Sequence, residues 1–325
     1  MTIYVRQKAE TRGYGGLRHK GFVNLLSQRI AAIDIGSNTV HMVVMDVAGS
    51  GVPLHRSSES VILKLGAVVK ADRTLPRSVY RKLRHTLKRF MHEAAKEKAA
   101  HVLVAATQAM RALRQGEEVL DRLSKEMKVP IHLLSSPREA ELGFLGVQAE
   151  VRPGQCQLIV DSGGASTELT LVKGSHPIET ISIPLGAAVL STQLRRDPPS
   201  AFEVARLMIP IIKALRAAPV KAVPRSALLT GGTAHHLLAV AKANPHRLTR
   251  RNLEEAIKRL LRKPAKKIAK KFDMEVERAR LLVPGALLVT ALLDHYSLDH
   301  LRVTKRGLRD GMAMAFMRDE AGWWK

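Results

Sequence analysis

Residues 158–172, LIVDSGGASTELTLV, contain the pattern from which we interpret the rest of the chain. The apolar residues 158–160 predict a short buried strand that ends at Asp161. Gly163 and Gly164 then predict a tight turn with positive φ, and the apolar residues that follow predict a returning strand. By itself, a Gly-Gly pair between two apolar runs is more typical of a plain hairpin than of a catalytic site.

The chemistry of this turn favours an anion and a metal. The backbone N–H groups of a glycine-rich turn form a concavity that attracts anions, and Ser166 adds a hydroxyl donor. Asp161 and Glu168 supply carboxylates, which are the ligands that Mg²⁺ prefers in proteins. The turn is therefore a candidate site at which phosphate and Mg²⁺ meet.

An earlier stretch, AAIDIGSNTVHMVVMD at residues 31–46, repeats the order of strand, acid, small-residue turn and strand. The two copies begin 127 residues apart, and aligning Asp34 with Asp161 places Gly36 on Gly163. A repeat on this scale predicts two related α/β domains that face each other across a cleft, each with one phosphate-binding turn.

A third turn fits the same arrangement. The apolar residues 227–230 precede Gly231, Gly232 and Thr233, and residues 234–243 have the pattern of a helix. Phosphate would then bind at the N-terminus of this helix. The alternation of predicted helices with strands along the chain favours an α/β architecture.

The composition is that of a globular protein. The chain has 325 residues, enough for about two domains, and 46% of them are hydrophobic. Cys156 is the one cysteine, which excludes an intramolecular disulfide and a cysteine-based zinc site. The longest apolar run, 283–293, contains a proline and a glycine and is shorter than the roughly 20 residues that cross a bilayer. The N-terminus lacks the apolar core of a signal peptide. We therefore expect a soluble, cytoplasmic protein.

The charge is strongly basic. There are 53 Lys and Arg against 29 Asp and Glu, a formal net charge of +24. Such a field attracts nucleic acid, inorganic polyphosphate or anionic lipid without choosing among them. Residues 258–271, KRLLRKPAKKIAKK, hold eight basic residues and no acid, and predict two basic helices separated at Pro264. Such a block is either a solvated surface or a site for a polyanion.

Other segments allow more than one interpretation. Residues 1–29 are basic and lack periodicity, which predicts a disordered extension, and residues 61–69 predict a strand that includes Lys64. Arg111 lies one helical turn beyond a predicted strand, where an arginine either holds a phosphate or is exposed. Glu139 lies near the start of a predicted helix, where acids usually only cap the dipole.

Two Asp-His pairs near the C-terminus, at 294–295 and 299–300, suggest a metal site. We interpret them as structural, because a bare pair of Asp-His dipeptides at a helix end is rarely a ligand set.

With these residues assembled, the chain resembles the exopolyphosphatase / guanosine pentaphosphate phosphatase family from residue 29 onward. The matching stretches are AAIDIGSNTVHMVV, VAATQAMRAL, SSPREAELGFLGV, LIVDSGGASTELTLV, SIPLGAAVLS, LLTGGTAHHL and VTKRGLRDGMA. The resemblance implies the actin-like, ribonuclease-H-like fold of acetate and sugar kinases in its short, two-domain form. It implies a first domain of residues 30–135 plus 308–325, whose last helix crosses back, and a second domain of residues 136–307.

The resemblance also implies roles for individual residues. Carried over by position, the three phosphate-binding loops are Gly36, Ser37, Asn38 and Thr39, then Gly163, Gly164 and Ser166, then Gly231, Gly232 and Thr233. Arg111 matches a phosphate-binding arginine, and Glu139 matches the glutamate that activates the attacking water. Asp161 and Glu168 match acids assigned to the metal and to that water, which makes Glu168 a second catalytic candidate.

The chain departs from the family pattern at a few positions. Ala165 replaces a glycine, Glu141 stands where an arginine is common, Pro137 and Arg138 replace acids, and Arg280 stands where an aspartate is expected. We expect Ala165 to tighten the second loop, because a Cβ atom penalises positive φ.

The resemblance implies a Mg²⁺-dependent phosphatase that releases terminal phosphate from inorganic polyphosphate by attack of water. The alternatives are a guanosine pentaphosphate 5′-phosphohydrolase, a kinase of the same fold, and a non-catalytic paralogue that binds polyanions or alarmones. The surplus positive charge favours the polymer. We further expect a homodimer, no membrane partner, and incidental nucleic-acid binding through the basic surface.

Overall fold

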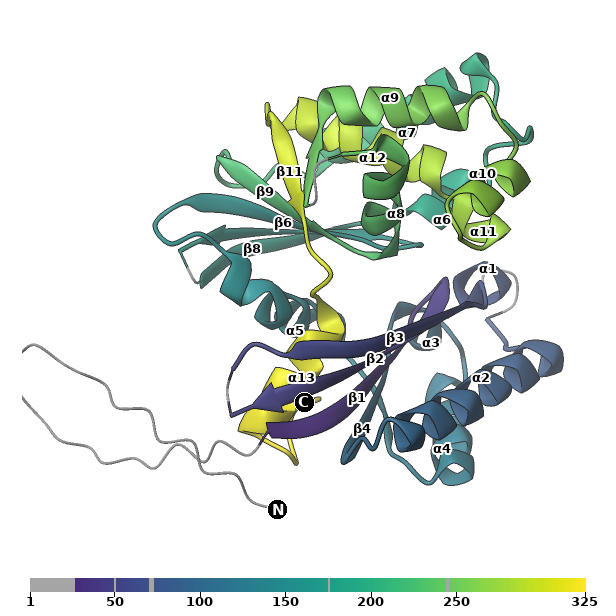
Figure 1. Cartoon of the computed structure of the whole chain (residues 1–325), viewed down its shortest axis with the longest axis vertical. Helices are drawn as coiled ribbons and strands as arrows, with labels where there is room; N and C mark the ends of the chain where they lie inside the picture. The colour runs from purple at the N-terminus through teal and green to yellow at the C-terminus, as the bar shows by residue number, and fades with distance from the viewer. Residues whose placement is uncertain (1–26, 50, 70–72, 175, 244–245) are drawn as a thin grey trace, which may run out of the picture.

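Two mixed β-sheets of matching topology form the framework of the two lobes of the molecule (Figure 1). The computed structural model describes residues 27–49, 51–69, 73–174, 176–243 and 246–325. The first sheet contains β1 (Ser27–Ile35), β2 (Thr39–Ala48), β3 (Leu54–Ile62), β4 (His101–Ala106) and β5 (Ile131–Leu133). The second contains β6 (Cys156–Ser162), β7 (Thr167–Lys173), β8 (His176–Ile183), β9 (Ser226–Thr230), β10 (Arg247–Thr249) and β11 (His300–Val303).

The strand orders reveal the internal repeat. The first sheet has the order β3-β2-β1-β4-β5, and the second has β8-β7-β6-β9-β11 with β10 added at its edge. In both sheets the first three strands pair antiparallel and the next pairings are parallel. The repeated sequence pattern therefore corresponds to a repeated topology.

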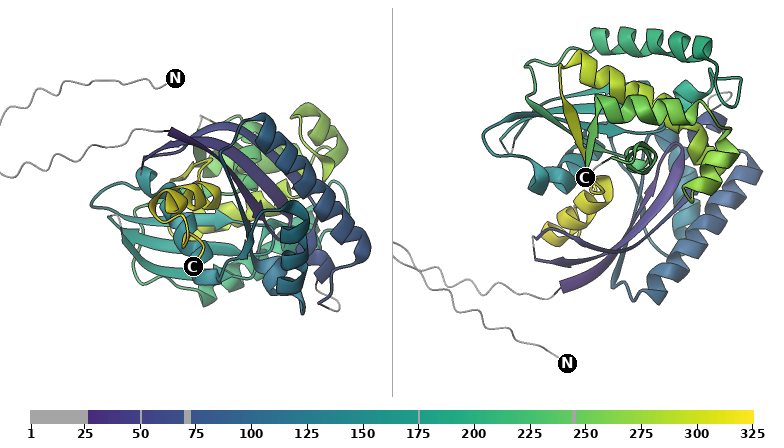
Figure 2. Two further views of the ribbon diagram at one scale, coloured as in Figure 1. Left: turned by 90° about the horizontal axis from the view of Figure 1, so that it is seen from below. Right: turned by 45° about the horizontal axis from the view of Figure 1, so that its top comes forward.

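Helices cover both faces of the first sheet. In this lobe lie α1 (Leu65–Val69), α2 (Arg77–Lys96), α3 (Gln108–Arg111), α4 (Gly116–Met127) and the C-terminal α13 (Leu308–Arg318). Side chains of β1 alternate between the faces. Ala31 and Ile33 pack in a cluster with residues of α2 and α4, whereas Ile30 and Ala32 pack with residues of α13. Figure 2, seen from below, shows α13 and α2 on opposite sides of these strands.

The second sheet is covered mainly on one face. Its helices are α6 (Ala187–Ser191), α7 (Ala201–Ala217), α8 (Gly232–Ala241), α9 (Arg250–Leu260), α10 (Ala265–Lys271), α11 (Val276–Arg280) and α12 (Leu282–His295). Leu158 and Val160 of β6 face a large core formed with these helices. Ile159 faces the other way, toward Phe144 and Val147 of α5 (Ser136–Val147), which continues into a 3-10 turn at Gln148–Glu150.

Glycines allow α5 and α13 to cross at very short distance between the lobes. A Cβ atom on Gly146 would lie 1.9 Å from the carbonyl oxygen of Gly307, and one on Gly311 would lie 1.8 Å from that of Leu142. No side chain fits at either position, so any larger residue would force the helices apart. This crossing fixes the position of α5, which carries Glu139, relative to the first sheet.

Two expectations about local structure are corrected. The strand predicted over residues 61–69 stops at Ile62, where β3 ends, because Lys64 adopts a left-handed conformation with φ of 54°. The N–H groups of Leu63 and Lys64 both donate to the carbonyl oxygen of Asn38, so this turn supports the first loop before α1 begins. Strand β1 already begins at Ser27, within the predicted extension 1–29, and residues 1–26 lie outside the described residues.

Candidate active site

The two repeated hairpins present the same turn. In β1–β2, Asp34 lies opposite His41 and the N–H of Gly36 donates to the carbonyl oxygen of Thr39 at 3.1 Å. In β6–β7, Asp161 lies opposite Glu168 and the N–H of Gly163 donates to Ser166 O at 3.0 Å. The alignment of Asp34 with Asp161 therefore holds in three dimensions.

The glycines of the second turn are needed for close contact, and the predicted positive φ is wrong. Neither Gly163 nor Gly164 has a positive φ, and a Cβ atom on Gly164 would lie 2.6 Å from Cβ of Asn38. The tips of the two loops thus touch across the lobes. Ala165 also avoids positive φ, so its expected strain is absent. The third turn does need a glycine, because Gly231 has φ of 107°.

The loop tips leave backbone donors free for an oxyanion. Among the described residues, no acceptor receives the N–H groups of Ser37 and Asn38, or those of Gly164 and Ala165. Exposed N–H groups that converge in a turn favour a phosphate oxygen. Ser166 extends toward the first lobe, where its hydroxyl lies 3.5 Å from Oε1 of Gln108.

Buried carboxylates lie behind these loops. Burial raises the pKa of Asp34 to about 6, although Arg309 opposes the rise. Burial, and then the charge of Glu168, raise the pKa of Asp161 to about 7, with Arg309 again opposing. Glu168 itself accepts a hydrogen bond from the hydroxyl of Ser182 at 3.0 Å. Several carboxyl groups with raised pKa in one place are typical of a functional site.

Glu139 joins this cluster from α5. Its Oε2 lies 2.8 Å from Nη1 of Arg111, which also donates to Leu134 O at 2.7 Å. The Glu139 side chain keeps 29% of its surface accessible, but surrounding protein atoms bury its carboxylate group. This burial raises the pKa of Glu139 to about 7, against the effect of Arg111 and together with that of Asp34.

Two arginines of the site were missed by the sequence analysis. Nη1 of Arg309 lies 3.5 Å from Oδ2 of Asp34, and its Nε is buried without a partner. Arg278 is 9% exposed, and no hydrogen bond or ion pair engages its guanidinium within the described part of the chain. Its guanidinium covers Gly232, where an added Cβ would lie 2.8 Å from Nη1. A buried, unpaired guanidinium at a helix N-terminus is suited to an anion.

The third predicted turn is only partly consistent with a phosphate site. Gly231 and Gly232 begin α8, as the sequence predicts. Thr233, however, is 5% exposed, and its methyl group packs against Gly285 of α12. Its side chain therefore stabilises the helix packing, and Arg278 occupies the space in front of the turn.

The donor set fits a hard divalent cation. Oδ1 of Asp34 is buried without a partner, and Asp161 lies directly opposite Glu168. No cage of three or more His, Cys, Asp or Glu side chains is preformed in the described residues. Mg²⁺ needs no such cage, because it keeps waters and takes one or two carboxylates together with substrate oxygens. Of the two Asp-His pairs, Asp294 forms an ion pair with Arg250.

A cavity of about 590 Å³ adjoins the loop tips. Both loops line it, through Asn38 and Gly164, and basic side chains from both lobes reach it, among them Lys64, Lys263 and Arg280. Lys64 and Glu277 form an ion pair between the lobes at this cavity. Arg280, which replaces an expected acid, pairs with the same Glu277 at 3.3 Å.

Residues 37–320 match the family model of the Ppx/GppA phosphatases. This chain belongs to the Ppx/GppA phosphatase family. Its relatives include exopolyphosphatase 1 of Mycobacterium leprae, 29% identical over 307 residues that cover 90% of this chain and 91% of the relative. Exopolyphosphatase 1 of Mycobacterium tuberculosis is 28% identical over 311 residues, which cover 90% of this chain and 89% of that protein.

Solved structures of Ppx/GppA proteins have the same fold. That of the Aquifex aeolicus family member has a TM-score of 0.75 and 27% identity, and the match covers 91% of this chain and 99% of that one. An exopolyphosphatase from Cytophaga hutchinsonii, 22% identical, has a TM-score of 0.76 over 90% of this chain and 98% of that one. The predicted α/β fold with two actin-like lobes is thereby confirmed. In the described residues no helix has the length and apolar character needed to cross a bilayer.

Proposed function

We propose that this protein releases terminal phosphate from inorganic polyphosphate by hydrolysis of a phosphoanhydride bond. The observation that carries the proposal is the arrangement of free loop N–H groups in front of buried carboxylates with raised pKa values. The names of the mycobacterial relatives and the net charge of +24 support the polymer as substrate.

Different residues would bind the phosphoryl group and accept the proton of the attacking water. The N–H groups of the two loops, with Arg111, would hold the terminal phosphoryl group and align it for in-line attack. Glu139 would accept the proton of the attacking water at a carboxylate oxygen while the new P–O bond forms. The bond to the remaining chain then breaks, and the shortened polyphosphate leaves with the negative charge.

We further propose that Asp161 and Glu168 would hold Mg²⁺, with Asp34 close by. When bound, Mg²⁺ supplies positive charge that neutralises the phosphate oxygens and polarises the phosphoryl group. Arg309 would hold Asp34 in place through their ion pair. We propose, in addition, two domains with the predicted boundaries, a cytoplasmic location and a homodimer.

The test of the function compares two substrates. Phosphate release is measured from long-chain polyphosphate and from guanosine pentaphosphate, side by side, with and without Mg²⁺. We expect Mg²⁺-dependent release with the higher kcat/KM on polyphosphate. A preference for the nucleotide would support the pentaphosphatase alternative, and binding without release would support a non-catalytic paralogue. Transfer to an acceptor would indicate a kinase.

We propose that the basic segment 258–271 guides a long polyanion toward the cleft. Arg259 donates to Val240 O and pairs with Glu255, while the other seven basic side chains are exposed. Among the described residues, none of these seven forms an ion pair. Lys263 lines the cavity next to both loops. Repulsion among these cations destabilises the helices, and a bound polyanion would relieve it while releasing counterions.

Reversing Lys266, Lys267, Lys270 and Lys271 to Glu should therefore weaken binding of long polyphosphate on the order of tenfold or more and flatten its salt dependence. Hydrolysis of tripolyphosphate, which cannot span both sites, should change little. The measurement is Kd for long chains across a salt series.

The matched control reverses four exposed cations of α2, Arg77, Arg81, Lys82 and Lys88, which changes the net charge equally. If both variants weaken binding alike, the effect is one of overall charge. If the first variant binds long polyphosphate with the affinity and salt dependence of the wild type, the segment is only a solvated surface.

A further inference from the structure

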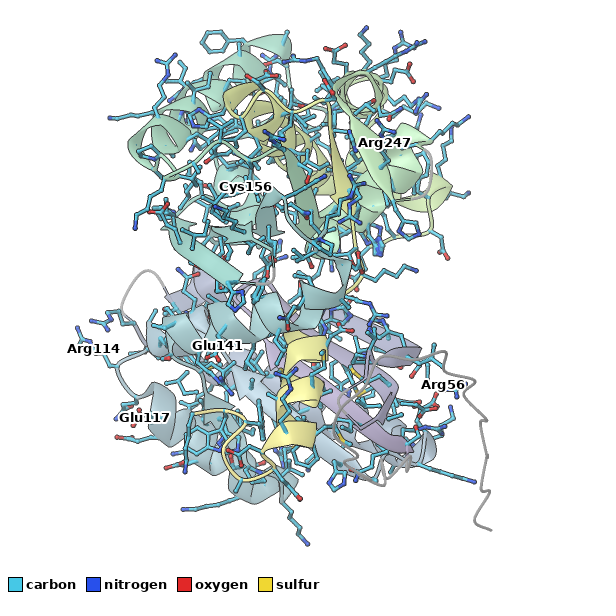
Figure 3. The ribbon with its side chains drawn as sticks, turned by 90° about the vertical axis from the view of Figure 1, so that its left-hand side faces the viewer. Arg56, Arg114, Glu117, Glu141, Cys156 and Arg247 are labelled. Carbon is cyan, nitrogen blue, oxygen red and sulfur yellow. The ribbon has the colours of Figure 1, made fainter. Side chains whose placement is uncertain are left out.

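The end of the chain returns to the first turn of α5, one residue before Glu139. Arg138 donates two hydrogen bonds to the carbonyl oxygen of Trp323, from Nε at 3.1 Å and from Nη2 at 2.6 Å. Its Nη1 lies 2.7 Å from Oε2 of Glu141, which Figure 3 shows near α13 in the lower lobe. A single guanidinium thus connects α5 with the C-terminal tail, residues 319–325.

The tail is a fixed structure, because its aromatic side chains are packed. Trp323 is 4% exposed and belongs to the core cluster that α13 forms with the first sheet. The ring of His132 stacks on Trp324 with centroids 4.3 Å apart and meets Trp323 edge-on at 5.4 Å. The N–H of Gly322 donates to Asp319 at 3.0 Å and closes the turn. The carbonyl oxygen that receives Arg138 is therefore held in place.

Arg111 holds the same part of the chain from its other side. It donates to Leu134 O, before α5 begins, and to the carboxylate of Glu139. Ser135 caps the helix by accepting from the N–H of Arg138 at 3.2 Å. The first turn of α5 is thus fixed at its start by Arg111 and Ser135, and at its side by the tail.

We propose that Arg138 and the tail form a clamp that positions Glu139 toward the attacking water. This proposal rests on the proposed function. A general base acts only within hydrogen-bond reach of the proton it removes, and a misplacement of about 1 Å can cost up to about 10²-fold in rate. Helix α13, which leads directly into the tail, carries Arg309 to Asp34. Docking of the C-terminus would therefore order the base and the carboxylate cluster together.

The clamp also accounts for two departures from the family pattern. Glu141 stands where an arginine is common, and Arg138 stands where an acid is expected. The two side chains pair with each other, so both departures belong to one ion pair in this chain. A carboxylate at position 138 could not donate to the carbonyl of Trp323. Arg138 supplies the donors that the clamp needs.

The test replaces Arg138 in the full-length protein. Arg138→Met keeps an apolar stem and removes the three donors, and we expect kcat to fall about tenfold while KM for long polyphosphate changes less than about twofold. Glu141→Gln is the matched control, because it leaves the bonds to Trp323 intact. Its kcat should stay within about twofold of wild type.

Hydrogen exchange provides a readout that is independent of activity. Amides 136–142 should exchange faster in Arg138→Met than in wild type or Glu141→Gln, with the β6–β7 hairpin unchanged. Wild-type kcat in Arg138→Met, a loss confined to KM, or a lower melting temperature without a loss of kcat would each overturn the clamp. If the wild type releases no phosphate from polyphosphate, the proposed function fails, and unaltered exchange at 136–142 would separately refute the clamp.

Discussion

Replacing Glu139 with Gln is expected to lower kcat about 10²-fold or more while leaving substrate affinity and melting temperature nearly unchanged. Burial raises the pKa of Glu139 to about 7, despite the opposing Arg111, so the carboxylate can take a proton near neutral pH. Gln has nearly the same shape, and its amide oxygen can still accept from Arg111, but it cannot remove a proton from water. Steady-state phosphate release and equilibrium binding of polyphosphate give the two quantities.

The pH dependence provides a second criterion for the same residue. Below its pKa a carboxyl group is protonated and cannot act as a base, so wild-type kcat should rise with pH through about 7 at saturating Mg²⁺. The residual kcat of Glu139→Gln should not show this rise with pH. Glu141→Gln serves as the control, because the Glu141 side chain is 66% exposed. This variant should keep the rise of kcat with pH. Wild-type turnover in Glu139→Gln would remove Glu139 from the mechanism.

The sequence predicted the framework of the site well, because that framework depends on local patterns. A short apolar run followed by an acid and small residues specifies a strand and a turn wherever it occurs, and here it occurs twice with one topology. Asp34 is equivalent to Asp161 in this repeat. The alignment of the two repeats already showed this equivalence, although the sequence analysis assigned no role to Asp34.

Features that depend on tertiary contacts could not be predicted in this way. Arg309 meets Asp34 only because α13 crosses back to the first sheet, and no local pattern distinguishes it from other arginines. Gly164 is required by its contact with Asn38 from the other lobe and not by a positive φ, and the sequence of the turn alone does not show that contact. Lys64 continues an apolar run that resembles a strand, but two hydrogen bonds to Asn38 O bend the chain there.

Replacing both Asp161 and Glu168 with Ala is expected to reduce Mg²⁺-dependent phosphate release to background. The two carboxyl groups face each other across β6–β7, and burial together with Glu168 raises the pKa of Asp161 to about 7. The metal-free protein therefore holds negative charge with little compensation beyond Arg309, and a divalent cation would relieve this cost.

Mg²⁺ should accordingly raise the melting temperature of the wild type at about pH 8, where Asp161 is ionised, and should leave that of the double variant unchanged. Without Mg²⁺, the double variant should melt no lower than wild type, because it lacks the repulsion between the two carboxylates. The control removes two exposed acids elsewhere, Glu117 and Glu254, and should retain both the activity and the Mg²⁺ shift. Full activity of chelator-treated wild type, or a Mg²⁺ shift that persists in the double variant, would show that these carboxylates do not hold the metal. The melting shift separates loss of the metal from loss of a proton acceptor, since Glu139→Gln should lower turnover strongly but keep the shift.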